Sequence, residues 1–421
     1  SGFPKQSESD CDAFDTGHSS TSISVALGMA KARDLRGEDR KIFAVIGDGA
    51  LSGGMAFEAM NNAARLKSNM VIVLNDNQMS ISKNVGGMSS YLGKIRTNGN
   101  YTELKEEVEN ALSKLPHLGD KLTSRIRGFK DLVKRVLIPG MLFEDMGLTY
   151  IGPIDGHNIQ QMVTAFESAS KMKEAVIVHV CTRKGKGYRP AEQNPSYFHG
   201  VSPFNLKDGS SRKTVESAQT YTDIFSETML ETAAERNDIV AVSAAMPSGT
   251  GLTGMAEKYP KQFFDVGIAE EHAVTFSAGL AAGGLKPVFA VYSSFLQRAF
   301  DQILHDVCIQ QLHVVFAIDR AGLVGSDGET HQGIFDVSFM SAIPNLTIIA
   351  PKDTKELIES VKFAMEYNSP IAIRFPRGTA YVAEKKTASL VELGKSEIVN
   401  DGYNIAIIAV GNMFEEVEKA Y

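Results

Sequence analysis

The sequence predicts an α/β protein with two domains, each built on a mainly parallel sheet flanked by helices. The chain has 421 residues, which exceeds the size of one ordinary domain. Short apolar runs alternate with helix-period stretches along most of the length, and this alternation stops and resumes around a proline-containing stretch. Repeated strand, crossover helix and strand units build parallel sheets, so two such sheets are expected.

The first series of elements lies before residue 190. Apolar runs predict buried strands at residues 41–46, 70–74 and 175–180, and helix-period patterns predict helices at residues 55–65 and 159–171. We therefore expect a first domain over residues 1–189.

Two segments depart from this alternation. Residues 86–139 are rich in Lys and Glu and helical in pattern, which indicates a helical insertion that leaves the first sheet and returns to it. Residues 190–220 contain three prolines, a Gly-Ser-Ser stretch and little apolar periodicity, which is typical of a linker.

The second series predicts a domain over residues 221–394. Its expected strands are at residues 239–242, 287–291, 312–318, 347–350 and 371–374. A further strand at residues 404–410 and part of a helix indicate the beginning of a third α/β domain over residues 395–421. We expect a chain truncated at this end.

Composition excludes several function classes. Lys and Arg number 43 against 50 for Asp and Glu, and the net charge of −7 argues against nucleic acid as a partner. Cys11, Cys181 and Cys308 lie far apart, so neither a disulfide framework nor a zinc site is expected. The longest uncharged run, residues 239–256, is broken by Pro247 and several glycines, so no membrane partner is expected.

Polar residues follow two strands of the first series. Gly47-Asp48-Gly49 ends the first strand, and Asn75-Asp76-Asn77 ends the next. Parallel strands bring their carboxyl ends to one edge of a sheet, so Asp48 and Asn77 could supply oxygen ligands to Mg²⁺ beside a bound phosphate. Each motif alone could be an ordinary turn. A dinucleotide-binding dehydrogenase is the weaker alternative, because no Gly-x-Gly-x-x-Gly opens a helix after a strand.

This pair of motifs resembles the thiamine diphosphate motif of the transketolase-like enzymes. The resemblance implies that the Asp48 and Asn77 side chains and the Met79 carbonyl hold Mg²⁺, which bridges the diphosphate. It also implies that Gly49 and Ala50 contact the cofactor.

A carboxylic acid is expected in the second domain. Thiamine chemistry needs such a group against the aminopyrimidine N1′, and an apolar cleft raises its pKa. The run from Phe263 to Val274 passes from a strand into a helix and contains Glu270 and Glu271. Either glutamate could simply complement a helix N-terminus. The resemblance assigns the activating role to Glu270.

More of the chain is similar to the 1-deoxy-D-xylulose 5-phosphate synthase family. The matching motifs occur in order at residues 1–5, 16–22, 152–157, 269–274, 292–298, 319–322 and 331–333. The resemblance implies two thiamine-diphosphate-binding-fold domains and a homodimer. It also implies that segments are missing at both ends, which leaves open whether this chain alone binds cofactor.

The implied activity is condensation of pyruvate with D-glyceraldehyde 3-phosphate, with release of CO₂, to give 1-deoxy-D-xylulose 5-phosphate. This is the first step of non-mevalonate isoprenoid synthesis and also feeds thiamine and pyridoxal synthesis, in the bacterial cytoplasm or the plastid stroma. A transketolase or a 2-oxo acid dehydrogenase component is an alternative enzyme. An inactive scaffold that retains the fold is an alternative of another class.

The resemblance assigns further residues to the cofactor. His18 and Ser20 would contact it, Lys184 would reach the diphosphate, and Phe295 would stack on the aminopyrimidine. From the sequence alone, Ser20 could be a helix cap, Lys184 a solvated charge and Phe295 a core residue.

The remaining candidates concern the substrates. Arg320 and Arg377 lie at predicted strand ends and could bind the substrate phosphate, whereas Arg374 is less favoured because it lies inside a strand. His199 aligns with a proton shuttle, and His331 is assigned to both catalysis and the substrate pocket. The other residues implied to line that pocket are Tyr292, Arg298 and Asp327.

Overall fold

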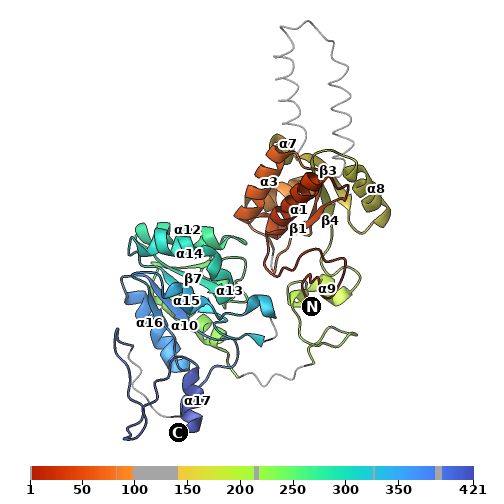
Figure 1. The fold of residues 1–421 in the computed structure, drawn as a ribbon. Helices are drawn as coiled ribbons and strands as arrows, with labels where there is room; N and C mark the ends of the chain where they lie inside the picture. The colour runs from red at the N-terminus through yellow and green to blue at the C-terminus, as the bar shows by residue number, and fades with distance from the viewer. Residues whose placement is uncertain (1, 82, 98–140, 213–217, 326–327, 385–390) are drawn as a thin grey trace. The chain divides into compact units, whose positions relative to one another are not determined.

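The computed structural model describes residues 2–81, 83–97, 141–212, 218–325, 328–384 and 391–421 (Figure 1). The chain forms two compact units, one of residues 18–213 and one of residues 1–17 with 214–421. Each contains its own parallel sheet, so the predicted α/β class with two parallel sheets is confirmed.

The unit of residues 18–213 has a four-stranded sheet in the order β1-β2-β4-β3. Its strands are β1 (Phe43–Gly47), β2 (Met70–Asp76), β3 (Thr149–Asp155) and β4 (Ala175–Cys181). The central strands β2 and β4 are buried along almost their whole length, which is why their sequences are nearly continuous apolar runs.

Helices cover both faces of this sheet. Side chains of α1 and α3 form one core with alternate strand residues, and α8 packs on the opposite face against Val176 and Val178 (Figure 1). The helices of the unit are α1 (Ser22–Arg36), α2 (Asp48–Leu51), α3 (Gly54–Leu66), α4 (Gly86–Thr97), α7 (Met141–Asp145), α8 (Ile159–Ser170), α9 (Arg189–Gln193) and the 3₁₀ turn η1 (Tyr197–His199).

The other unit has a six-stranded sheet in the order β6-β5-β7-β8-β10-β9. Its strands are β5 (Ile239–Ser243), β6 (Phe263–Asp265), β7 (Lys286–Tyr292), β8 (Val315–Asp319), β9 (Thr347–Ile349) and β10 (Ile371–Arg374). Two long helices, α10 (Tyr221–Glu235) and α16 (Thr354–Glu366), share a core with alternate residues of the central strands. The helix α12 (Glu270–Ala282) contacts β7 and β5 from the other side (Figure 1).

The helices of this unit differ in length. The α-helices are α10 (Tyr221–Glu235), α11 (Thr253–Lys258), α12 (Glu270–Ala282), α13 (Ser293–Leu296), α14 (Phe300–Gln302), α15 (Asp336–Met340), α16 (Thr354–Glu366) and α17 (Met413–Ala420), with 3₁₀ or π turns η2 (Gln297–Ala299), η3 (Ile303–Cys308) and η5 (Glu329–His331). Thr220 caps α10 by accepting a hydrogen bond from the backbone N–H of Asp223, whose carboxylate accepts one from the Thr220 N–H in return.

The N-terminal segment was expected at the start of the first domain, but it is grouped with residues 214–421. Two side-chain contacts join the segment to this unit. Lys5 Nζ lies 2.9 Å from a Glu329 carboxylate oxygen, and the Phe3 ring stacks on the His331 ring with centroids 5.2 Å apart.

The strand β3 was not predicted. Gly152 and Pro153 interrupt its apolar pattern, and proline is normally confined to edge strands or irregularities. In the structure β3 is an edge strand whose register with β4 shifts between Ile151 and Ile154. The irregularity therefore accommodates the proline. Within the predicted insertion, residues 86–97 are helical, and residues 98–139 lie outside the described residues.

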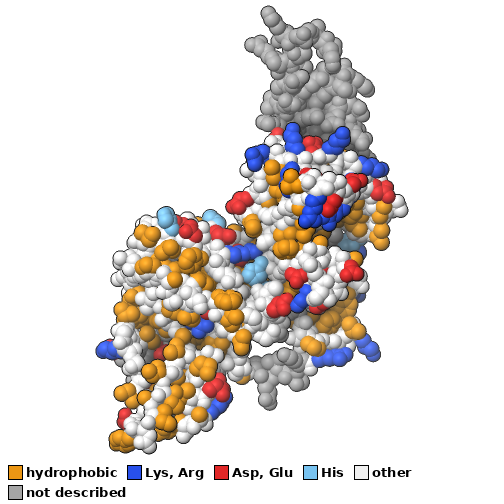
Figure 2. Space-filling model, viewed as in Figure 1, with side chains coloured by type: hydrophobic (Ala, Val, Ile, Leu, Met, Phe, Trp, Pro, Cys, Tyr) orange, Lys and Arg blue, Asp and Glu red, His pale blue; other side chains and the backbone are white. Residues whose placement is uncertain are grey.

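The strand predicted at residues 404–410 is wrong. This segment pairs with no strand in the described part of the chain, and its side chains are largely exposed: Ile405, Ile407, Ile408 and Val410. Figure 2 shows hydrophobic side chains gathered on the surface over this C-terminal region. An apolar run becomes a strand only when a neighbouring strand pairs with it, and the sequence pattern cannot supply that neighbour.

Candidate active site

The first group of predicted residues lies at the carboxyl edge of the four-stranded sheet. Strands β1 and β2 are parallel neighbours with Gly47 opposite Asn75, so Asp48 lies beside the turn that follows β2. The Gln78 N–H donates to Asp48 Oδ2 at 2.8 Å. Asn77 Oδ1 accepts a hydrogen bond from the Met79 N–H at 2.9 Å. The structure thus brings Asp48 and the Asn77 turn together, as the sequence predicted.

Asp48 has an unsatisfied oxygen. Its Oδ1 atom is buried and has no hydrogen-bond partner within the described part of the chain. Burial, together with the hydrogen bond and the charge of the neighbouring Asp76, raises the pKa of this carboxyl to about 6. A buried oxygen in this state is suited to a cation, because a cation would replace the missing partner and favour the ionised form.

The backbone next to Asp48 is closely packed against neighbouring side chains. A Cβ atom on Gly49 would lie 2.8 Å from Asn84 Oδ1 and 3.0 Å from Ser80 Cβ, so only glycine fits without displacement. Ser20 Oγ donates to the Ala50 carbonyl at 2.7 Å, which brings the segment containing His18 and Ser20 to α2. The Asn84 amide nitrogen is also buried with no partner among the described residues. No sequence motif indicated Asn84.

Lys184 and His199 lie together in the same unit. Lys184 Nζ lies 2.5 Å from the Ser80 carbonyl and 2.8 Å from His199 Nδ1. Desolvation lowers the pKa of Lys184, against the opposing charge of Asp48. Desolvation, followed by the charge of Lys184, also lowers the pKa of His199. A neutral His199 that accepts from Lys184 at Nδ1 carries its proton at Nε2.

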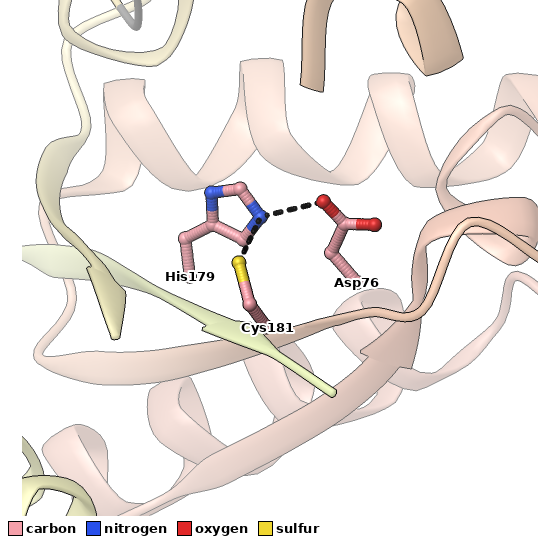
Figure 3. Close-up of side chains that lie close together, drawn as sticks. All are labelled: Asp76, His179 and Cys181. Atoms are coloured by element: carbon pink, nitrogen blue, oxygen red, sulfur yellow. Dashed lines mark hydrogen bonds and ion pairs between the residues drawn. The ribbon is translucent and has the colours of Figure 1, made fainter. Parts of the chain in front are cut away.

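A second cluster is formed by side chains of β2 and β4 (Figure 3). His179 Nε2 lies 3.0 Å from Asp76 Oδ2 and 3.9 Å from Cys181 Sγ. Burial raises the pKa of Cys181 to about 11, so its thiol stays protonated near neutral pH. Asp76 is already paired with the Arg96 guanidinium. These groups satisfy one another, and they form a hydrogen-bond network rather than an open metal site.

In the other unit, Glu270 begins α12 and is 3% exposed. Its Oε2 atom has no hydrogen-bond partner among the residues described, and Arg298 Nη1 lies 3.5 Å away. Burial raises the pKa of Glu270, although the nearby Arg298 charge opposes this shift. The result is a desolvated carboxyl whose Oε2 atom faces the Arg298 charge without a hydrogen bond from the described residues. A buried carboxyl of this kind is what an activating acid requires.

Four further candidates, three with aromatic rings and one arginine, lie in contact with one another. Tyr292 and Phe295 stack with centroids 5.8 Å apart, and the Phe295 ring meets the His331 ring edge-on at 5.2 Å. The Arg320 guanidinium carbon lies 3.8 Å from the centre of the Tyr292 ring. The structure therefore brings these four residues together from the end of β7, from α13, from the residue after β8 and from the end of η5.

The arginines near β8 and β10 differ in their surroundings. Asp319, at the end of β8, is 1% exposed, and burial raises its pKa to about 6 while Arg320 and Arg377 act in the opposite direction. Arg374 is held by Asp336 through contacts of 2.9 and 3.2 Å, which agrees with its lower rank as a phosphate ligand. Asp327 lies outside the described residues.

Family comparisons bear on both units. Residues 1–182 match the family described as 1-deoxy-D-xylulose-5-phosphate synthase, and residues 217–381 match the pyrimidine-binding domain of transketolase. The 1-deoxy-D-xylulose-5-phosphate synthase of Clostridium tetani is 54% identical over 421 residues, which are 100% of this chain and 67% of that protein. The chain belongs to the 1-deoxy-D-xylulose-5-phosphate synthase family.

Other relatives in this family agree. The synthase of Lachnoclostridium phytofermentans is 60% identical over 99% of this chain and 66% of its own length, and that of Natranaerobius thermophilus is 53% identical over the same shares. The chain thus spans about two thirds of the length of these curated relatives. A solved structure described as a split-gene transketolase, inactive β4 tetramer, is 28% identical with a TM-score of 0.43, covering 48% of this chain and 66% of that one.

The synthase family is thiamine diphosphate-dependent, usually with Mg²⁺. The described residues fit these groups. The unpaired Asp48 oxygen suits a hard cation, Gly49 allows a close backbone approach, and Glu270 offers a buried carboxyl. No helix of the described residues has both the length and the apolarity to cross a membrane.

We predict that Gly49→Ala lowers the free energy of unfolding by about 1–3 kcal/mol, because its Cβ would overlap Asn84 and Ser80. Gly47→Ala is the matched control in the same motif, since its Cβ would meet no atom within 4 Å. Urea unfolding of both variants without ligands measures the difference. Equal effects of the two substitutions would contradict the steric argument.

We predict a pH-dependent effect of Asp319→Asn. The folded-state pKa of Asp319 is raised from 3.8 to about 6, so the folded state binds this proton more tightly than the unfolded chain. The free energy of unfolding should therefore fall as pH rises through that interval, by about 1–3 kcal/mol from this group. Asn keeps an acceptor for the Arg320 N–H and a group that can pair with the Thr222 hydroxyl.

The measurement is the difference between Asp319→Asn and the parent in urea unfolding at pH 4 and pH 8. The variant should gain stability relative to the parent at the higher pH. Asp401→Asn, at an exposed position of the same unit, is the control and should show no such gain. A pH-independent difference for Asp319→Asn would show that this carboxyl does not ionise with a raised pKa.

Proposed function

We propose that the protein condenses pyruvate with D-glyceraldehyde 3-phosphate, using thiamine diphosphate and Mg²⁺, to form 1-deoxy-D-xylulose 5-phosphate and CO₂. The observation that carries this proposal is Glu270 at the start of α12, a buried carboxyl with a raised pKa and an oxygen that has no hydrogen-bond partner among the described residues. Such a group can share a proton with a ring nitrogen, which is the acid that thiamine chemistry requires. Membership of the synthase family supports the choice of substrates.

The unit of residues 18–213 would hold the metal and the diphosphate. Asp48 Oδ1, Asn77 Oδ1 and the Met79 carbonyl are the proposed Mg²⁺ ligands, all oxygen atoms as this cation prefers. The positive charge of Lys184 would offset phosphate charge. Gly49 and Ala50 would let the backbone approach the diphosphate, and His18 and Ser20 would complete that side of the site.

The other unit would bind and activate the aminopyrimidine. Glu270 would hold a proton at N1′, and Phe295 would provide a ring face for stacking. When bound, thiamine diphosphate supplies a carbon nucleophile for the pyruvate carbonyl and accepts the electron pair released as CO₂ departs. The protein's task is to orient these partners and to keep the Glu270 carboxyl desolvated.

Cationic and polar groups would bind the substrates. Arg320 and Arg377 would hold the phosphate of D-glyceraldehyde 3-phosphate through charge-assisted hydrogen bonds. His199, with its proton placed at Nε2 by Lys184, would exchange a proton with the substrate oxygens, and His331 would share this role. The other residues proposed for the pocket are Tyr292, Arg298 and Asp327.

We further propose that the protein is a homodimer. We also propose the bacterial cytoplasm rather than the plastid stroma as its location, since the relatives named above are bacterial. The product would enter non-mevalonate isoprenoid synthesis and the synthesis of thiamine and pyridoxal.

Product analysis tests the reaction. The natural protein, incubated with pyruvate, D-glyceraldehyde 3-phosphate, thiamine diphosphate and Mg²⁺, should release CO₂ and 1-deoxy-D-xylulose 5-phosphate in equal amounts, as measured by NMR with ¹³C-labelled pyruvate. A transketolase or a 2-oxo acid dehydrogenase component would not form this product. Absence of any turnover with bound cofactor would favour the scaffold alternative.

We predict that Glu270→Gln lowers kcat by roughly 10²–10⁴-fold, because an amide cannot exchange a proton with N1′. The change keeps the shape of the side chain, so thiamine diphosphate should still bind in calorimetry. Glu271→Gln is the matched control, since Glu271 is the next residue of α12 and is exposed. Its kcat should stay within about twofold of the parent, and an equal loss in both variants would argue against the assignment of Glu270.

A further inference from the structure

A chain of buried hydrogen bonds links side chains from three strands of the four-stranded sheet. The Tyr150 hydroxyl on edge strand β3 lies 2.7 Å from His179 Nδ1 on β4, and His179 Nε2 lies 3.0 Å from Asp76 Oδ2 at the end of β2 (Figure 3). All three residues are at most 3% exposed. A neutral imidazole that accepts from Tyr150 and donates to Asp76 satisfies every group in this chain.

The packing holds His179 in one place. A Cβ atom on Gly152 would lie 2.6 Å from the His179 carbonyl, so β3 passes closely over the backbone of β4 there. His179 is fully buried, and its two ring nitrogens face fixed partners on different strands. The proposed mechanism does not use this histidine.

Asp76 connects this chain to the proposed metal ligands. Its carboxylate accepts the Gln78 N–H at 3.2 Å, and the same N–H donates to Asp48 at 2.8 Å. The Asp76 carbonyl accepts from the Thr182 N–H at 2.9 Å and from Arg96 at 2.6 Å. Asp76 is thus tied to β4, to α4 and to its own turn.

The turn itself needs this support. Gln78 has a φ of +62°, in the left-handed region that side-chain-bearing residues rarely adopt. Asn77 and Met79, on either side of Gln78, carry the proposed side-chain and carbonyl ligands. A change in the Gln78 backbone conformation would move the ligand atoms of both neighbours. The Asp76 and Asp48 carboxylates stabilise the observed conformation by accepting hydrogen bonds from the Gln78 N–H.

We propose that Tyr150 and His179 are positioning residues that fix Asp76 and, through it, the 76–79 turn in the geometry that binds Mg²⁺. The proposal rests on the ligand set given under Proposed function. The two side chains act through Asp76 and touch neither the cofactor nor the substrates.

The test measures Mg²⁺ affinity by calorimetry in the natural protein saturated with thiamine diphosphate, together with thermal unfolding of the ligand-free form. His179→Leu should weaken Mg²⁺ binding by roughly 10–100-fold, the usual effect of losing a group that orients a metal ligand. Tyr150→Phe, which keeps the ring, should weaken it by a smaller factor. His179→Gln, whose amide can still donate to Asp76, should recover part of the loss.

Val178→Ala is the matched control. Val178 is fully buried on the same strand but faces α8, so its truncation lowers stability without touching the network. Mg²⁺ affinity should be unchanged in this variant even where its unfolding temperature falls as far as that of His179→Leu.

Three outcomes separate the possibilities. Parent-like Mg²⁺ affinity in both His179→Leu and Tyr150→Phe would overturn the positioning role. An equal loss of affinity in Val178→Ala would show that the effect is general destabilisation and would also overturn it. If the parent itself binds no Mg²⁺ with thiamine diphosphate, the proposed ligand set fails, and the inference fails with it.

Discussion

Parallel strand pairing is the constraint on which the rest of the structure depends. In a parallel sheet the carboxyl ends of all strands lie at the same edge. Residues that follow different strands therefore meet there, although they are far apart in the sequence. The register of β1 with β2 brings Asp48 to the turn after β2, and the register of β2 with β4 brings Asp76 to Cys181. In the other unit, the register of β7 with β8 places Tyr292 beside Asp319.

Buried carboxyls are the chemical result of this arrangement. Asp48, Glu270 and Asp319 each lie at the end of a strand or the start of a helix, and burial raises the pKa of each one. Burying an ionisable group in this way opposes folding, so the apolar cores beneath both sheet edges must offset it. Two of the three, Asp48 and Glu270, also keep an oxygen without a hydrogen-bond partner among the described residues, which is the state expected of groups that await a ligand.

Much of this sheet edge could be predicted from the sequence. The pattern of apolar residues predicts the strands, and the polar motifs directly follow them. Buried parallel strands are continuous apolar runs, and β10 was predicted with the bounds that it has. The meeting of Asp48 with the Asn77 turn follows from strand pairing alone. The roles of Glu270 and Phe295, in contrast, came from family resemblance, because no pattern distinguishes a buried glutamate from a helix-terminal one.

What the sequence could not predict depends on partners distant in the chain. The strand β3 was missed because its Gly-Pro pair opposes a strand, and only its edge position and shifted register accommodate it. No sequence motif singles out His179. Its partners Tyr150 and Asp76 lie on β3 and β2. Because β3 was not predicted, the network could not be predicted either.

The Asn75-Asp76-Asn77 motif shows the same limit within three residues. Asn75 Oδ1 accepts from the Thr182 hydroxyl at 2.6 Å, Asp76 is held by His179 and Arg96, and Asn77 Oδ1 accepts from the Met79 N–H. Burial alone would raise the pKa of Asp76, but the His179 hydrogen bond and the Arg96 charge lower it overall, whereas the pKa of Asp48 is raised. Of the two adjacent carboxyls, Asp76 therefore has partners within the protein that favour its ionised form, and Asp48 is the one that a cation would stabilise in the proposed site.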